Sequence, residues 1–173
     1  VLEALGRADE ALQCCDHALT INPRSEPALV EKAMMVAARG QMEDARTYCD
    51  RALKINPRNE QAWVNMGAAM DALGQQMEAL GCYNNALTLN PRNEQAWFNA
   101  GAVLGELGRH QEALGCCQRT LALNPRNEQA WVNSGLTLGE LERPEEALEC
   151  FERAIALNSQ LEYAWFNKGV TLV

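Results

Sequence analysis

The stretch Asn56-Pro57-Arg58-Asn59-Glu60-Gln61-Ala62-Trp63 recurs without change at residues 90–97 and 124–131. The interval between copies is 34 residues. The same interval relates three single-residue series: Trp63, Trp97, Trp131 and Trp165; Pro23, Pro57, Pro91 and Pro125; and Gly67, Gly101, Gly135 and Gly169. A fixed period of this length is typical of a solenoid, in which copies of one small unit stack on their neighbours.

Each period is predicted to contain two helices. Trp63, Gly67 and Met70 lie at helical spacing and form one apolar stripe, and Ala79 and Tyr83 belong to a second stripe. The glycine of the first stripe has no side chain, so we expect the paired helix to approach it closely.

The ends of these helices are also predicted by sequence. Asn59 and its equivalents stand where an N-cap belongs, and Glu and Gln follow in the first turn. Gly74 and Gly108 are placed to end first helices. The Asn-Pro pair before each new unit ends the second helix, because proline lacks an N–H and disfavours helical geometry in the residue before it.

These residues resemble the tetratricopeptide-repeat (TPR) family, whose signature is W-x2-L-G-x2-Y, then A-x3-F, then P. The second full unit reads Trp63-x2-Met66-Gly67-x2-Met70, then Ala79-x3-Tyr83. The resemblance covers the whole chain. It implies an all-α fold: a TPR α-solenoid, a right-handed superhelix of stacked antiparallel helix pairs.

The resemblance assigns residues 1–173 to a single array. Its full units are 26–59, 60–93, 94–127 and 128–161, a partial unit occupies 1–25, and a further partial unit at 162–173 supplies a first helix only. The chain does not begin with methionine and both ends cut through a first helix. We therefore expect it to be a piece of a longer protein.

Composition and charge argue against several classes of partner. The net charge is −8, and no basic block is present to neutralise phosphates, so no nucleic-acid partner is expected. No apolar run approaches the roughly 18 residues of a membrane span, so no membrane partner is expected either. The array is predicted to be cytoplasmic.

Catalysis, cofactors and metal ions are not expected. The two histidines, His17 and His110, are far apart and suggest no nucleophile–base pair. The seven cysteines contain no CxxC pair, and neither histidine completes a ligand cluster. Their spacing of about one repeat favours reduced thiols packed in the core, as in a reducing cytoplasm. The tryptophans are predicted to be core residues as well.

A second series lies on the other face of the first helices. An α-helix turns about 100° per residue, which places Asn65 about 200° from Trp63. In the resembled family this face lines the concave groove, with Ala102 and Leu136 one turn further along. The candidate groove residues are Asn65, Asn99, Asn133 and Asn167, here called the asparagine row; Gln61 and Gln95; and an apolar flank of Val64, Phe98, Val132 and Phe166.

Asparagine carries both a donor and an acceptor, so a row of them can pair with the backbone of an extended peptide. The row is similar to that in the TPR superhelix of O-linked N-acetylglucosamine transferase. The alternative is that these amides bond only within or between neighbouring first helices. The sequence thus predicts a non-catalytic scaffold that binds an extended or amphipathic peptide of a protein partner, or the recognition arm of a larger enzyme.

Self-association is the second hypothesis. The partial unit at 162–173 lacks a second helix and is expected to expose Trp165 and Leu172. The partial unit at 1–25 has a whole second helix but lacks most of its first helix. Head-to-tail stacking of identical chains would complete the missing unit and give an open homo-oligomer.

Overall fold

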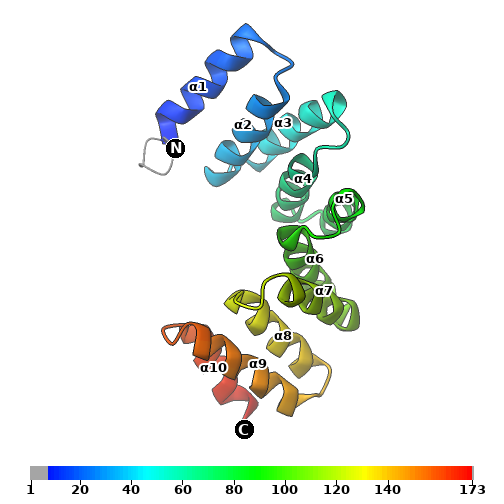
Figure 1. Cartoon of the computed structure of the whole chain (residues 1–173), viewed down its shortest axis with the longest axis vertical. Helices are drawn as coiled ribbons and strands as arrows, with labels where there is room; N and C mark the ends of the chain where they lie inside the picture. Colours follow the sequence, from blue (N-terminus) through cyan, green and yellow to red (C-terminus); the bar gives the residue numbers. More distant parts are fainter. Residues whose placement is uncertain (1–7, 173) are drawn as a thin grey trace. The chain divides into compact units, whose positions relative to one another are not determined.

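The computed structural model describes residues 8–172, which form ten α-helices and no β-strand (Figure 1). The start of the partial unit at 1–25 therefore lies outside the described residues. The helices are α1 (Ala8–Ile21), α2 (Glu26–Ala38), α3 (Met42–Ile55), α4 (Glu60–Ala72), α5 (Gln76–Leu89), α6 (Glu94–Glu106), α7 (His110–Leu123), α8 (Glu128–Glu140), α9 (Pro144–Leu157) and α10 (Glu162–Thr171).

The chain forms two compact parts. The N-terminal part, Val1–Pro91, contains α1–α5, and the C-terminal part, Arg92–Val173, contains α6–α10. Within each part every helix packs on the next one along the chain. The prediction of an all-α fold of stacked helix pairs is confirmed. None of the helices in residues 8–172 combines the length and the apolarity that crossing a membrane requires.

Glycine sets the spacing within helix pairs. A Cβ added at Gly67 on α4 would lie 2.6 Å from Tyr83 Cε1 on α5, and one added at Gly135 on α8 would lie 2.6 Å from Phe151 Cε1 on α9. Both rings are almost wholly buried. At Gly101, where Cys117 replaces the aromatic, the added Cβ would meet Cys116 Cβ at 3.0 Å. The expected close approach is thus confirmed at all three glycines.

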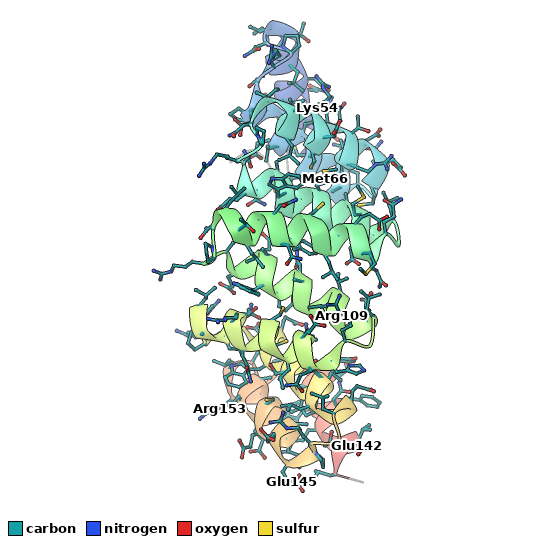
Figure 2. The ribbon with its side chains drawn as sticks, turned by 90° about the vertical axis from the view of Figure 1, so that its right-hand side faces the viewer. Lys54, Met66, Arg109, Glu142, Glu145 and Arg153 are labelled. Carbon is teal, nitrogen blue, oxygen red and sulfur yellow. The ribbon has the colours of Figure 1, made fainter. Side chains whose placement is uncertain are left out.

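Helix ends follow the predicted chemistry in most units. The side chains of Asn59, Asn93 and Asn127 accept hydrogen bonds from backbone N–H groups three residues on, over 2.7 to 2.9 Å. Gly74 and Gly108 adopt positive φ angles of 75° and 71° after their first helices. The connection between α8 and α9 has no glycine there, and Glu142 adopts φ 57° instead (Figure 2).

A hydrogen bond between the two ends of a unit was not predicted. Glu94, in the first turn of α6, accepts from Asn124 Nδ2 at 2.9 Å and from Asn127 Nδ2 at 2.8 Å. Glu26 binds Asn56 and Asn59 in the same way. Asn127 therefore caps α8 through its oxygen and binds α6 through its nitrogen, so one residue joins two units.

The tryptophans differ from the prediction that they are core residues. Trp63, Trp97 and Trp131 are half-buried and Trp165 is exposed. The indole N–H of Trp63 donates to the carbonyl of Pro57 at 2.9 Å, and that of Trp131 donates to Pro125 at 3.0 Å. Indole needs a partner for its N–H, and the turn before the helix supplies one. This bond holds the ring at the edge of the core.

Two glycines of α8 give a matched test of the close approach. Gly135→Ala should lower the free energy of unfolding by about 1 to 3 kcal/mol, because the new methyl group overlaps the Phe151 ring. Gly139→Ala, in the same helix with nothing within 4 Å, should raise it by about 0.5 to 1 kcal/mol through helix propensity. Urea titration followed by circular dichroism measures both. Equal effects of the two substitutions would contradict the contact.

Candidate functional site

In the N-terminal part, the predicted groove residues bond to one another. Gln61 Nε2 donates to Asn65 Oδ1 at 2.8 Å, one turn along α4. Asn65 Nδ2 is buried and has no hydrogen-bond partner. The helix therefore satisfies the acceptor of this amide itself and leaves the donor unsatisfied, which is unfavourable by about 1 to 3 kcal/mol.

The apolar flank is only partly accessible. Val64 and Val132 are 1% and 2% exposed, so assigning them to a groove surface was wrong. Val132 belongs to a core cluster with Leu138 and Ala164, because first helices of adjacent units also pack against each other. Phe98 is half-buried and Phe166 is 64% exposed. Only these two members of the flank can reach a ligand.

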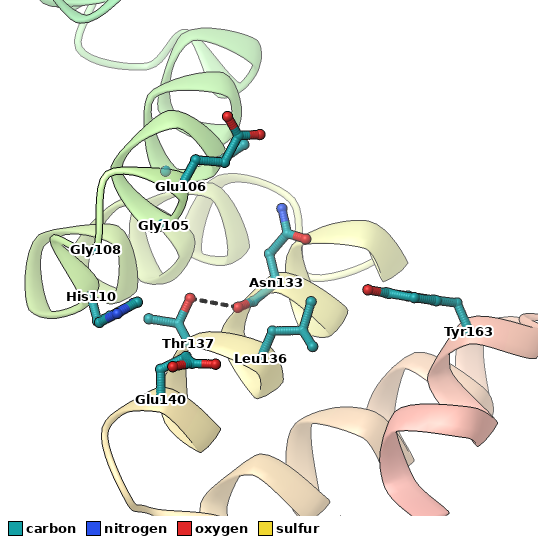
Figure 3. Close-up of a pocket in the computed structure, with 11 residues that line it drawn as sticks. Gly105, Glu106, Gly108, His110, Asn133, Leu136, Thr137, Glu140 and Tyr163 are labelled. Carbon is teal, nitrogen blue, oxygen red and sulfur yellow. Dashed lines mark hydrogen bonds between the residues drawn. The ribbon is translucent and has the colours of Figure 1, made fainter. Parts of the chain in front are cut away.

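A pocket of about 590 Å³ opens in the C-terminal part (Figure 3). Of the asparagine row, Asn133 lines it, together with Leu136 one turn further along α8. Ala102, Gly101 and Gly105 of α6 supply a wall of small residues. The predicted face of the first helices is therefore hollowed at this unit.

Several residues of the pocket were not predicted. Glu106 and Glu140 line it from the last residues of α6 and α8, and His110 lines it from the first residue of α7. Tyr163 reaches it from α10, with its ring directed toward the space beside Asn133 (Figure 3). Thr137 also lines it, and its hydroxyl donates to the Asn133 carbonyl at 2.7 Å. The signal available in the sequence was the pair of glutamates at equivalent positions, 34 residues apart.

The remaining members of the predicted groove are dispersed. Asn99 is half-buried and Gln95 is exposed, both on α6 outside the pocket lining. Asn167 Nδ2 donates to the Tyr163 carbonyl of its own helix at 2.7 Å. Within the asparagine row, Asn65 and Asn167 therefore bond locally, whereas Asn133 lines a pocket.

The predicted self-association residues lie on the surface, Trp165 on α10 and Leu172 directly after it. Trp165 is 52% exposed and Leu172 is 65% exposed. A Cβ added at Gly169 of the same helix would meet no atom within 4 Å, unlike one at Gly67 or Gly135. The face of α10 that corresponds to the packed face of α4 and α8 is therefore open.

The cysteines are mostly structural, as predicted. Cys49, Cys82, Cys116, Cys117 and Cys150 are buried, Cys15 is half-buried and Cys14 is exposed. Burial raises the pKa of Cys49 to about 12 and the pKa values of Cys82, Cys116 and Cys150 to about 11. Among residues 8–172, no three His, Cys, Asp or Glu side chains are grouped as a metal site would need.

Thiol labelling tests this burial. At pH 8 the native protein should react rapidly with a disulfide reagent at Cys14 and slowly at the five buried thiols, which become reactive only on unfolding. Folding raises these pKa values because burial disfavours the thiolate. The contribution of the buried thiols to the free energy of unfolding is therefore fully present below the unfolded pKa of about 8.5 and is lost as the pH rises toward 11 to 12. Rapid labelling of all seven cysteines in the native protein would contradict the burial of the five thiols.

Two family models match the sequence. A tetratricopeptide-repeat model matches residues 92–160, and a model of the N-terminal TPR repeats region of Psidin matches residues 3–101. No curated protein matches the chain.

Solved structures resemble the chain over nearly its whole length. MamA gives a TM-score of 0.81 at 19% identity, covering 92% of this chain and 93% of that one. YrrB, described as a TPR protein with an unusual peptide-binding site, gives 0.79 at 24% identity, covering 97% and 87%. TTC0263, a thermophilic TPR protein of Thermus thermophilus, gives 0.78 at 24% identity, covering 99% and 93%. At these identities the likeness concerns the fold.

Proposed function

The chain belongs to the tetratricopeptide-repeat family, and from this premise we propose that it is a protein-interaction scaffold that binds an extended peptide segment of a partner on the face of its first helices. The scaffold itself carries out no reaction. The observation that carries the proposal is the pocket beside Asn133 in the C-terminal part.

The volume and lining of the pocket support peptide binding. Its volume of about 590 Å³ lies within the range of about 300 to 1,000 Å³ that is usual for ligand pockets. Asn133 offers an amide donor and acceptor to a backbone peptide group, and Leu136 offers apolar surface beside it. The small residues Gly101, Ala102 and Gly105 leave room for a main chain to lie against α6.

The relatives give independent support. The YrrB structure, which shares this fold, is described as having a peptide-binding site. A repeat scaffold with a hollowed face offers a surface that can be adapted to many sequences by changing the residues along that face. This agrees with the variation seen here, where equivalent first-helix positions hold Ala68, Ala102 and Leu136.

Selection from a random peptide library, followed by fluorescence anisotropy, tests the proposal. Asn133→Ala should weaken the selected peptides by about fivefold to tenfold, because one or two hydrogen bonds are lost. Asn85→Ala, at an exposed asparagine of the second helix α5, is the control and should leave affinity unchanged. The proposal is wrong if no peptide is selected. It is also wrong if the selected peptides bind two variants, Asn133→Ala and the triple alanine variant of Asn65, Asn99 and Asn133, as tightly as they bind the wild type.

Self-association through α10 is a second candidate, favoured by two observations. Gly169 and Trp165 lie on a face that α4 and α8 cover with a second helix. The second helix α1 exposes Cys14, although Cys82 and Cys116, two and three repeats further along, are buried. The α10 face of one copy and the α1 face of another would then pair as first and second helices do within a unit.

Disulfide trapping tests this pairing. If α1 of a second copy covers α10, Gly169→Cys should form an intermolecular disulfide with Cys14, since the equivalent Gly101 approaches Cys116 closely. Gly139→Cys, on another helix, is the control. Light scattering should also show mass growth with concentration, lost in Trp165→Ala with Leu172→Ala. A monomer at every concentration, with no trapped dimer, would rule the pairing out.

A further inference from the structure

The pocket beside Asn133 carries negative charge that the equivalent positions of the N-terminal part lack. Helices α6 and α8 both end in glutamate, Glu106 and Glu140, and both side chains line the pocket. Helices α2 and α4 end in Ala38 and Ala72 at the same repeat position. Among the described residues, the pocket lining contains no lysine or arginine, and its ionisable side chains besides the two glutamates are His110 and Tyr163.

The helix ends add to this charge. The C-terminus of an α-helix carries a partial negative charge and favours a cation nearby by about 0.3 to 1 kcal/mol. The last turns of α6 and α8 contain no basic residue and end in a carboxylate instead. Two helix C-termini, each ending in a carboxylate, therefore line one pocket and favour a cation there.

The arginines next in sequence have other partners. Arg109 follows α6 and donates through Nε and Nη2 to the two carboxylate oxygens of Glu112, both at 2.7 Å. Arg143 follows α8 and binds Glu146 in the same way. Bidentate pairs of this kind are among the stronger ionic hydrogen bonds. The two cations that the sequence places nearest to the pocket are thus held on the second helices, and Glu140 forms no ion pair with any residue in 8–172.

Tyr163 completes the features that would recognise a cation. Its side chain is 56% exposed and enters the pocket from α10, opposite the small residues of α6 (Figure 3). An exposed tyrosine face attracts a guanidinium or ammonium group, and arginine stacks on it especially well. In Figure 3 the side chain of Asn133 lies between those of Glu106 and Tyr163, where its amide can bind the main chain of the same ligand.

We propose that the pocket formed by Glu106, Glu140, Asn133 and Tyr163 takes a basic side chain, arginine above all, of an extended peptide segment of a partner protein. This rests on the proposed peptide-binding function and specifies its ligand. The carboxylates pair with the cation, Tyr163 packs on its plane and Asn133 binds the adjacent main chain.

Fluorescein-labelled peptides that differ only in carrying arginine, glutamine or glutamate at alternate positions test this on the whole chain by anisotropy. The arginine peptide should bind at least about tenfold more tightly than the glutamate peptide at low salt, with a smaller difference at high salt. E106Q with E140Q should weaken the arginine peptide about fivefold or more. The charge-matched control E142Q with E145Q changes two exposed carboxylates outside the pocket and should stay within about twofold (Figure 2).

The outcomes separate the two proposals. If all three peptides bind equally well and Asn133→Ala weakens all of them, the basic-ligand inference is overturned while peptide binding stands. The basic-ligand inference is also overturned if the preference for the arginine peptide survives in E106Q with E140Q. It is overturned as well if the control E142Q with E145Q loses the preference equally, since the preference then depends only on the net charge of the chain. If none of the three peptides binds, both proposals fail. Circular dichroism spectra equal to the wild type ensure that each variant is folded.

Discussion

In each of three helix pairs, a glycine of the first helix lets the second helix approach to van der Waals contact. At Gly67 and Gly135 the space of a side chain is filled by the ring of Tyr83 or Phe151, and at Gly101 it is filled by atoms of α7 itself. This distance fixes which residues of the first helix face its partner. It also fixes which residues are left on the opposite face, so Asn133 and Leu136 reach the pocket because Gly135 holds α8 against α9.

The hydrogen bonds between unit ends set the next level of order. Glu94 binds Asn124 and Asn127, and Asn127 in turn caps α8. The position of α8 relative to α6 is therefore specified by directional bonds as well as by apolar packing. Tyr163, one unit further on, is brought to the same pocket by the packing of α10 on α8 and α9. A ligand at this site would contact residues from three consecutive units.

The sequence predicted the fold well because every unit carries the same signals again. Glycines at the helix seam, asparagine caps and glycine helix ends such as Gly74 depend on neighbours within one unit, where spacing fixes geometry. The errors concern contacts between units. Val64 and Val132 lie about 100° from the tryptophan of their helix, a direction that one helix alone leaves open. Both are buried, and Val132 packs in a cluster with Ala164 of the next first helix, α10. The role of Tyr163 in the pocket could not be predicted from α8 alone, because the residue comes from α10.

The double role of the capping asparagine has a consequence for how such a chain can change in length. Because Asn59 serves α4 with its oxygen and Glu26 with its nitrogen, the boundary between units is shared rather than a joint between independent modules. Asn59, Asn93 and Asn127 occupy the same repeat position, so removing or duplicating one full period within residues 59–127 brings an asparagine to the same place and keeps a partner for both bonds. Removing one helix leaves a carboxylate facing the wrong residue. Because one asparagine amide bonds to both units, insertions and deletions in this array are expected to comprise whole periods.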